Sequence, residues 1–418
     1  MQGVRAVAVI GAGAVGLSVA LALARLGNRD GPSITVIDEN PAATGASKGN
    51  AGVIVAGGAV PLILPGVMGE AMRMLMGADR ALRIAPGHLP RLLPWLRRAM
   101  ATANEHDAVH GAAALEQLAA PSADHWRADL AEAGASALIG DSLFIHATRG
   151  PQPDMEAIAW QLKRAEGVGL IALDRAMLAE IEPALSPDYG HAIAMEGMAR
   201  LHDPEAAGKA LQRAAASLGT AMLQARVTGI ARDGTNWQIT TTQRRLEADL
   251  VVVAAGWASR ALLSSLGVDI PLEAEHGRHV TLPWAETDIR NSVMDSGARM
   301  VASRMANGVR LAGSSAFTGP GRPPDPEDDL PAMLQIAERM FPGIDTEGAI
   351  PWAGSRPSLP DSIPVIGPVP GHPGLWAAFG HGHYGMTMAP ATGRLIASMI
   401  AGARPTVDPR PYDPARFA

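Results

Sequence analysis

The sequence predicts an α/β fold. Residues 7–10 form a short apolar run, a glycine-rich turn follows at 11–16, and residues 17–26 carry Leu and Ala at helical spacing. A second apolar run, 34–37, completes a strand–helix–strand unit, and a third, 250–253, stands more than halfway along the chain. Short continuous apolar runs are typical of parallel strands buried on both faces. They indicate a Rossmann-type sheet whose strands come from distant segments.

Length and pattern predict more than one domain. A chain of 418 residues, 47% of them hydrophobic, exceeds what one ordinary core accommodates. Further helices are predicted within 108–134 and at 174–181, 204–218 and 389–400, with Asp203 as an N-cap. Strands are predicted at 280–283 and 309–313, a polar linker at 316–328, and a turn-rich segment at 354–367.

Charge and residue usage exclude several classes of protein. The net charge is −6 and no basic stripe is present, which argues against nucleic acid as a ligand. Cysteine is absent, so the chain has no disulfide, no thiol nucleophile and no Cys-ligated metal. Residues 7–26 are hydrophobic enough to suggest a membrane span, but their glycines favour a strand–turn–helix. No leader segment is predicted, and we expect a cytoplasmic protein.

The glycine turn predicts a dinucleotide site. Gly11 permits a tight turn out of the strand, Gly13 lets the backbone approach a pyrophosphate, and Gly16 lets the helix pack close to the strand. The helix N-terminus offers free N–H groups to an anion. Asp38 ends the second strand, where a carboxylate can accept hydrogen bonds from ribose hydroxyls. The spacing alone does not distinguish FAD from NAD.

Two further stretches carry a family resemblance. A loop reads GASKGNAG over 45–52, and a C-terminal run reads WAGSRP over 352–357, PD at 360–361, PVIG over 364–367 and GHGHYG over 380–385. With the N-terminal motif, these resemble the FAD-dependent D-amino-acid oxidase/dehydrogenase superfamily, in its D-amino-acid dehydrogenase-like branch that includes D-hydroxyproline dehydrogenases. The likeness covers most of the chain and is weak over 99–169.

The resemblance implies a non-covalently bound FAD and two interleaved domains. The FAD-binding domain would comprise 1–60, 190–260 and 350–418, and a mixed-sheet α+β substrate domain would comprise 61–189 and 261–349. The last helix would point its N-terminus at the flavin pyrimidine ring. The expected FAD-binding residues are Gly11, Gly13, Ala14, Val15, Gly16, Asp38, Glu39, Ser47, Asn50, Ala51, Gly52, Val227, Ala255, Gly256, Gly354, Gly382, His383, Gly385, Met386 and Thr387.

Three residues are candidates for the chemistry. Arg356 aligns with the family arginine that holds the substrate carboxylate, a task suited to two parallel hydrogen bonds; the alternative is a structural arginine that braces the turn. His383 replaces an arginine of some relatives and could donate a hydrogen bond, contact a cyclic substrate or accept a proton; the alternative is a structural histidine. Tyr384 lies beside it. His381 is expected on the flavin side or as a turn-stabilising residue.

Three other features favour a structural interpretation. Arg278 stands where relatives often have tyrosine, and we expect it to be exposed to solvent rather than to reach the substrate. The spacing of His276 and His279 resembles a metal pair, but the chemistry needs no metal and none is predicted. Residues 92–98 are amphipathic and basic, and packing against the substrate domain is favoured over contact with a membrane surface.

The predicted function is FAD-dependent oxidation of the C–N bond of a small D-amino or cyclic imino acid, with D-hydroxyproline as one candidate. Hydride would pass from Cα to flavin N5. The alternatives are a glycine or sarcosine oxidase, the flavin subunit of a heteromeric dehydrogenase, and a flavin-binding module that is non-catalytic or only relays electrons. The sequence leaves open the electron acceptor (quinone, oxygen or a protein) and the oligomeric state.

Overall fold

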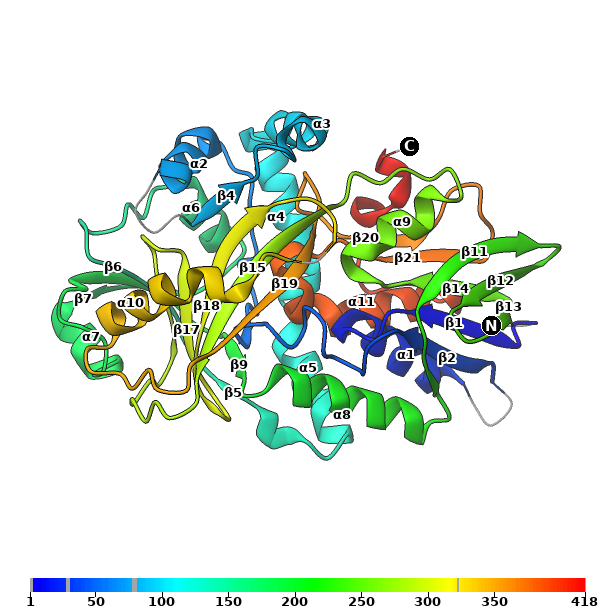
Figure 1. The fold of residues 1–418 in the computed structure, drawn as a ribbon, viewed down its shortest axis with the longest axis horizontal. Helices are drawn as coiled ribbons and strands as arrows, with labels where there is room; N and C mark the ends of the chain where they lie inside the picture. Colours follow the sequence, from blue (N-terminus) through cyan, green and yellow to red (C-terminus); the bar gives the residue numbers. More distant parts are fainter. Residues whose placement is uncertain (1–2, 28–30, 77–80, 322, 418) are drawn as a thin grey trace.

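A computed structural model describes residues 3–27, 31–76, 81–321 and 323–417. Within these residues, the strands form a six-stranded sheet, a nine-stranded sheet and two three-stranded sheets. Figure 1 shows the two large sheets at opposite ends of an elongated molecule, with helices α4, α5 and α11 between them. We call the two large sheets the β1 sheet and the β15 sheet, after a strand that each contains.

The β1 sheet is assembled from distant segments, as the apolar runs predict. Its order is β10-β2-β1-β14-β21-β20, and every neighbouring pair is parallel except β20 and β21. The strands are β1 (Ala6–Ile10), β2 (Ser33–Asp38), β10 (Ala221–Gln224), β14 (Leu250–Val253), β20 (Val365–Pro368) and β21 (Leu375–Phe379).

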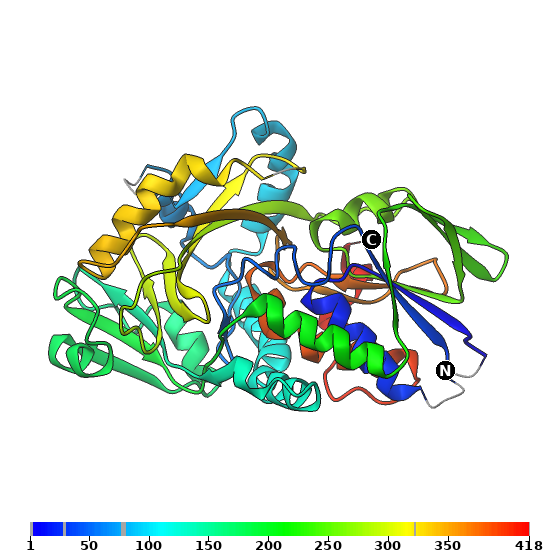
Figure 2. The ribbon, with the colours of Figure 1, turned by 60° about the horizontal axis from the view of Figure 1, so that its bottom comes forward.

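Helices α1 (Ala14–Leu26), α8 (Pro204–Ser217) and α11 (Gly385–Ile400) pack with the β1 sheet, as Figure 2 shows from below. Helices α1 and α11 approach closely, since a Cβ on Gly393 would lie 2.4 Å from the carbonyl oxygen of Ser18. The opposite face carries β11 (Val227–Asp233), β12 (Asn236–Thr241) and β13 (Arg245–Ala248).

The β15 sheet has the order β19-β15-β18-β17-β16-β6-β8-β7, with β4 beside β18. Its strands are β4 (Leu82–Ile84), β6 (Phe144–Thr148), β7 (Leu170–Asp174), β8 (His191–Met195), β15 (Glu273–Leu282), β16 (Ser292–Asp295), β17 (Met300–Met305), β18 (Gly308–Phe317) and β19 (Ile350–Ser358). One face packs its apolar residues against α10 (Leu330–Met340). The other face is turned toward the β1 sheet and lines a cavity.

A bulge interrupts the pairing of β15 with β18. The register shifts between His276 and Arg278, so that Gly277 faces two residues of β18. Ser314 lies in this bulge with a φ of +58°, a conformation that is costly for a residue with a side chain. Bulges redirect side chains and backbone groups. Ser314 lines the cavity at this point, and its carbonyl oxygen accepts a hydrogen bond from Arg356.

The remaining elements cover the edges and the centre. The helices are α2 (Val67–Met76), α3 (Leu89–Ala101), α4 (Glu105–Ala119), α5 (Ser122–Glu132), α6 (Ile158–Ala165), α7 (Arg175–Ile181) and α9 (Ser259–Ser264). Short 3₁₀ turns are η1 (Ser136–Leu138), η2 (Gly256–Ala258), η3 (Pro326–Asp329), η4 (Gly382–Tyr384), η5 (Arg410–Tyr412) and η6 (Pro414–Phe417). A small sheet joins β3 (Val53–Ile54), β9 (Ala199–Leu201) and β5 (Ile139–Asp141).

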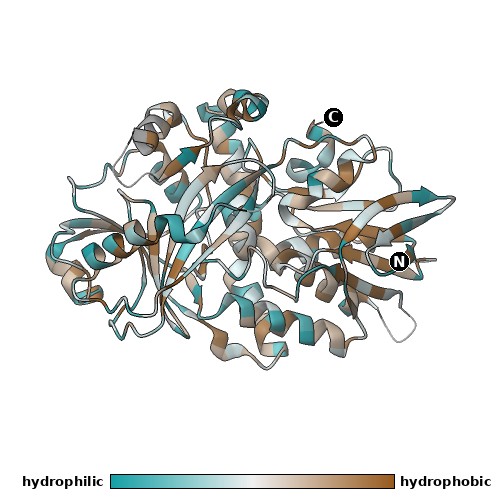
Figure 3. Cartoon of the chain, viewed as in Figure 1, coloured by the Kyte–Doolittle hydropathy of each residue, from teal (hydrophilic) through white to brown (hydrophobic). Residues whose placement is uncertain are grey.

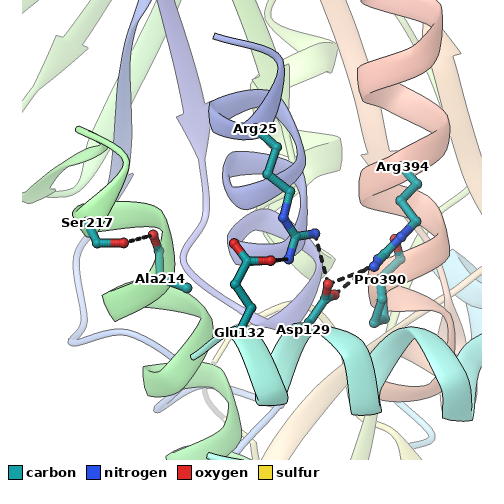
Figure 4. Close-up of polar contacts among 7 residues, drawn as sticks. All are labelled: Arg25, Asp129, Glu132, Ala214, Ser217, Pro390 and Arg394. Carbon is teal, nitrogen blue, oxygen red and sulfur yellow. Dashed lines mark hydrogen bonds and ion pairs between the residues drawn. The ribbon is translucent and has the colours of Figure 1, made fainter. Parts of the chain in front are cut away.

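One buried carboxylate links helices α1 and α11, which both pack with the β1 sheet. Asp129 of α5 is 1% exposed and pairs with Arg25 of α1 at 2.8 Å and with Arg394 of α11 at 2.7 Å (Figure 4). Glu132 makes a second contact with Arg25 at 2.6 Å. Removing a partner from a buried ion pair leaves an uncompensated charge. Asp129 therefore helps to hold α1 and α11 in a fixed relation, through the last turn of α1 and the second half of α11.

Hydropathy follows this architecture. In Figure 3 brown, hydrophobic residues dominate the strands around the N-terminus, whereas the strands of the β15 sheet carry both hydrophobic and hydrophilic residues. The predicted helix at 204–218 is confirmed as α8, and Asp203 caps it by accepting a hydrogen bond from the N–H of Ala206 at 2.9 Å. The helices predicted at 108–134, 174–181 and 389–400 are confirmed as α4 with α5, α7 and α11.

Two predictions about local structure need correction. The segment 354–367 does not begin as turns, because its first five residues continue strand β19. The strand predicted at 280–283 is the end of the longer β15, whose ten residues are all buried. Charged residues in β15 and β19 interrupt the hydrophobic pattern by which a buried strand is recognised. They can be buried because their partners lie on neighbouring strands.

The domain boundaries remain a prediction. Strands β8 and β19 pair within the β15 sheet, although the predicted boundaries place them with the segments of the FAD-binding domain. The predicted ranges also include residues 1–2, 28–30, 77–80, 322 and 418, which lie outside the described residues.

Candidate active site

One continuous cavity joins the two sheets. Its volume is about 2030 Å³, and it extends from the glycine turn after β1 to the inner face of the β15 sheet. The lining also includes the 44–51 loop, the strand β19 and the start of α11. The cavity therefore has a backbone-rich end at the glycine turn and a side-chain-rich end at β15.

The glycine turn has the geometry that a pyrophosphate requires. Gly11 has a φ of +111°, and a Cβ on it would lie 2.3 Å from the carbonyl oxygen of Ala254. A Cβ on Gly13 would meet only the Ser47 hydroxyl, at 3.5 Å, so Gly13 leaves space on the cavity side. Gly11 is required by the fold, whereas the space beside Gly13 is available to a ligand.

Two residues predicted to bind FAD, Gly16 and Gly52, do not lie at the cavity. Gly16 does not line the cavity, and a Cβ on it would lie 1.9 Å from the carbonyl oxygen of Gly11. Gly52 also lies off the cavity, with a φ of +79° and a Cβ position 2.4 Å from the carbonyl oxygen of Leu201. Both glycines therefore permit close backbone packing, and direct contact with the cofactor is not supported for them.

The carboxylate of Asp38 shapes the turn. Its Oδ2 accepts a hydrogen bond from the N–H of Ala12 at 2.7 Å, and its Oδ1 accepts one from the N–H of Asn40 at 2.8 Å. Ser47 accepts a hydrogen bond from the N–H of Ala14 at 3.0 Å, which ties the 44–51 loop to the start of α1. Asp38 and Ser47 both line the cavity, and each retains further acceptor capacity.

Two helices point their N-termini at the cavity. The first turns of α1 and α11, both fully described, contain no acidic residue, and neither helix has a side-chain cap. Their free N–H groups and partial positive charge favour anionic or electron-rich ligand groups. A long cavity with such a site at two points fits an FAD, whose pyrophosphate the residues at the start of α1 would hold.

The turn before α11 is held by a buried histidine. His381 is 2% exposed, and its Nε2 lies 2.9 Å from the hydroxyl of Thr392. Burial lowers the pKa of His381 to about 3, so the ring is neutral. Gly380 and Gly382, with φ of +87° and +50°, allow the sharp reversal around it. This geometry supports the turn-stabilising interpretation of His381.

The structure brings most of the predicted residues to one cavity. The following line it: Gly11, Gly13, Ala14, Val15, Asp38, Glu39, Ser47, Asn50, Ala51, Val227, Ala255, Gly256, Gly354, Arg356, Gly382, His383, Tyr384, Gly385, Met386 and Thr387.

Glu275 is a site residue that sequence reasoning missed. Its side chain is 5% exposed, and its Oε1 lies 2.7 Å from Nε2 of His383 and 3.4 Å from Nη1 of Arg356. Ser315 and Ser358 donate hydrogen bonds to its two oxygens at 2.5 and 2.6 Å. Burial opposes the charged form, but His383, Arg356 and the hydroxyls outweigh it and hold the pKa of Glu275 well below its usual range.

Arg356 lies on the cavity face of β19, opposite Glu275 in the register. Its Nη1 donates a hydrogen bond to the carbonyl oxygen of Ser314 at 3.0 Å, the residue that the bulge places in the left-handed conformation. The guanidinium covers Gly277, where a Cβ would lie 2.3 Å from Nη2. A glycine at this position is therefore a condition for the arginine to lie flat on the sheet.

His383 and Tyr384 differ in what their polar atoms can reach. The side chain of His383 is 35% exposed and faces Glu275. The hydroxyl of Tyr384 instead donates to the carbonyl oxygen of Val60 at 3.0 Å and lies 3.3 Å from the N–H of the same residue. Burial raises the pKa of Tyr384 to about 12. The contacts of Tyr384 support a role in bracing the chain at Val60 rather than in chemistry.

The prediction that Arg278 is exposed is wrong. It is 4% exposed and forms an ion pair with Asp329, which also pairs with Arg83 of β4. Desolvation lowers the pKa of Arg278, and the positive charge of Arg83 lowers it further. Sequence reasoning could not find this, because the partner carboxylate lies about fifty positions away.

His276 and His279 have separate partners. Nδ1 of His276 lies 2.8 Å from the hydroxyl of Ser355, while the ring of His279 stacks on Trp352 at 4.9 Å between centroids. Among the described residues, no group of three or more potential metal-ligating side chains was found.

Comparison with known proteins decides the family. The family model described as FAD dependent oxidoreductase matches residues 6–399. The chain belongs to this family of FAD-dependent oxidoreductases. The sequence prediction of FAD as cofactor is thereby confirmed.

Two relatives match this FAD-dependent oxidoreductase over nearly its whole length. A D-amino-acid oxidase of Bradyrhizobium diazoefficiens is 33% identical and covers 99% of both chains. A D-amino acid dehydrogenase 2 of Ralstonia nicotianae is 31% identical, over 98% of this chain and 100% of that one. The crystal structure of L-proline dehydrogenase from P. horikoshii shares the fold, with a TM-score of 0.73, 19% identity and coverage of 100% and 98%.

Proposed function

We propose that this FAD-dependent oxidoreductase oxidises the C–N bond of a small D-amino acid or cyclic imino acid. The observation that carries the proposal is the guanidinium of Arg356 on the cavity face, beside the carboxylate of Glu275 and the imidazole of His383. A zwitterionic amino acid presents a carboxylate and an amine, and this site offers a partner for each. The relatives named D-amino-acid oxidase and D-amino acid dehydrogenase support the same substrate class.

Each residue has a distinct task in this proposal. Arg356 binds the substrate carboxylate through the guanidinium edge that Glu275 and Ser314 leave available. His383 contacts the amine from η4, and Tyr384 fixes the wall at Val60. The bound flavin would accept a hydride from Cα, which carries both electrons of the oxidation, and the N-terminus of α11 would stabilise the negative charge that results.

The substrate is proposed to be compact, with D-hydroxyproline as one candidate. Anaerobic titration of the FAD-loaded protein with D-amino acids, D-prolines, glycine and N-methyl amino acids tests this. Bleaching of the flavin spectrum by a D-amino or cyclic imino acid is expected. Preferential reduction by glycine or sarcosine would instead support an amine oxidase of that type, and failure of every compound would exclude a self-sufficient amino-acid enzyme.

The variant Arg356→Ala sharpens the same test. A charge-assisted hydrogen bond contributes about 1.5–3 kcal/mol, so kcat/KM should fall about 10- to 150-fold. The FAD content should stay unchanged, because Arg356 contacts the β15 sheet rather than the glycine turn. Loss of FAD from this variant would show that the arginine is structural.

The proposal also covers where the protein acts in the cell and which molecule accepts the electrons from its flavin. None of the helices within the described residues is long and apolar enough to cross a bilayer. Helix α3 buries Leu92, Trp95 and Ala99, which pack in one apolar cluster with Phe317 of β18. Its outer side exposes Leu89, Leu93 and Met100 with Arg91, Arg97 and Arg98.

An apolar and basic surface suits peripheral contact with the cytoplasmic face of an anionic membrane, where a quinone could accept the electrons. Co-sedimentation with vesicles containing phosphatidylglycerol should then weaken in an Arg97→Glu, Arg98→Glu variant. Equal recovery of both proteins in the supernatant would remove this part of the proposal.

A further inference from the structure

The carboxylate of Glu275 occupies the centre of the side-chain end of the cavity. It comes from β15, and its partners come from three other elements: Ser315 from β18, Arg356 and Ser358 from β19, and His383 from η4. With four contacts on two oxygens and 5% exposure, Glu275 has little capacity left for a ligand. Its influence on a substrate must pass through the groups that it holds.

The contact with Glu275 fixes the tautomer of His383. A carboxylate only accepts hydrogen bonds, so the 2.7 Å contact places a hydrogen on Nε2 of the imidazole. Among the described residues, no hydrogen bond engages Nδ1 of His383, and the ring borders the cavity. Whenever the ring is neutral, this contact leaves the lone pair of Nδ1 as the acceptor.

Arg356 is fixed on one edge by the same carboxylate. Its Nη1 lies 3.4 Å from Oε1 of Glu275 and donates to the carbonyl oxygen of Ser314. Within the described part of the chain, no hydrogen bond engages its Nε or Nη2. These two donors are the pair that a planar carboxylate accepts in parallel.

We propose that Glu275 is a positioning residue that orients His383 to accept the proton of the substrate ammonium while it holds Arg356 for the substrate carboxylate. The inference rests on the proposed function, since it requires a substrate that carries both groups. In this step an N–H bond of the ammonium breaks and its proton forms a bond with Nδ1 of His383. The electron pair stays on the substrate nitrogen, so no atom is oxidised or reduced.

The charge arrangement suits this proton transfer. Before it, the carboxylate of Glu275 balances the guanidinium of Arg356. After it, the same carboxylate stabilises the imidazolium of His383. The charged or titratable groups in direct contact with Glu275 are Arg356 and His383, and along its own strand Glu273, His276 and Arg278 have partners of their own.

The matched control lies two residues away. Glu273 is a buried carboxylate on the same strand, paired with Arg260 at 3.2 Å and with His88 at 3.3 Å, and it does not line the cavity. The variants Glu275→Gln and Glu273→Gln therefore remove the same charge from similar surroundings, inside and outside the site.

The first readout uses the FAD-loaded wild-type protein without substrate. Nitrogen NMR after ¹⁵N-histidine labelling, with the signal identified by its loss in His383→Asn, should show that the neutral form of His383 carries its hydrogen on Nε2 and has an unprotonated Nδ1. The reverse tautomer would overturn the proposal whether or not any amine reduces the flavin.

The second readout separates binding from turnover. In Glu275→Gln, kcat/KM for the best amine should fall about 10- to 100-fold, and its acidic limb should move to lower pH. Binding of propionate, a carboxylate without an amine, should be retained or become tighter, because Arg356 loses a competing anion. Glu273→Gln should behave as the wild type.

Besides the reverse tautomer, two outcomes would decide against the positioning role. Equal loss of propionate binding and turnover would indicate a structural role, and an unchanged pH profile would show that His383 does not act through Glu275. If Glu275→Gln does not fold, the wild-type tautomer still decides. If no amine reduces the wild-type flavin, the proposed function fails first, which the substrate screen shows separately.

Discussion

The two ends of the cavity recognise ligands in different ways. At the glycine turn, the backbone forms the surface: Gly11 turns the chain, Gly13 leaves space and the N–H groups of α1 face the cavity. At the β15 sheet, side chains form it, and Glu275, Arg356 and His383 come from three separate elements. Backbone recognition depends on conformation, which a few consecutive residues determine. Side-chain recognition here depends on the register between strands.

The largest effects of substitution are expected at the glycine turn, where Gly11 and Gly13 should respond differently to replacement by alanine. Gly11→Ala places a Cβ against the carbonyl oxygen of Ala254 at a positive φ and should destabilise the protein by about 2–4 kcal/mol. Gly13→Ala meets only Ser47 at ordinary contact distance, so its stability without FAD should change by less than about 0.5 kcal/mol.

Gly13→Ala should nevertheless weaken FAD binding at least about tenfold, or 1.4 kcal/mol, because the methyl group fills space beside the pyrophosphate site. Thermal unfolding of the apoprotein and fluorescence titration with FAD measure the two effects. Equal loss of stability in both variants would mean that the turn serves the fold alone and would remove the contrast between Gly11 and Gly13.

The smallest effect is expected at Tyr384, which lies between the two ends. Tyr384→Phe removes the hydrogen bonds to the backbone of Val60 and should cost about 1 kcal/mol of unfolding free energy. Because the hydroxyl is directed away from Glu275 and Arg356, kcat should change less than about threefold at saturating substrate. A large loss of kcat with unchanged stability would restore the catalytic role that the sequence suggested for Tyr384.

The two ends of the cavity were predictable from the sequence to different degrees, because one is formed by backbone and the other by side chains from separate strands. The strands and helix of the N-terminal unit were predictable because each is a short run with its own hydrophobic period. Strand β15 was not, because Glu275, His276, Arg278 and His279 interrupt its pattern although all four are buried. Their partners stand on β18, β19, η3, η4 and the 44–52 loop, and a linear pattern does not contain such pairings.

The sequence by itself determined the family, the cofactor and the guanidinium expected to bind a carboxylate, because glycine spacing and the C-terminal motif are local and chemically specific. Only the tertiary structure showed Glu275 between Arg356 and His383, the buried pair of Arg278 with Asp329, and the hydrogen bond from Arg356 to the carbonyl oxygen of Ser314. The arrangement around Glu275 depends on the register of β15 with β18 and β19 and on the contact of η4 with β19. Both arise from packing between segments far apart in the chain.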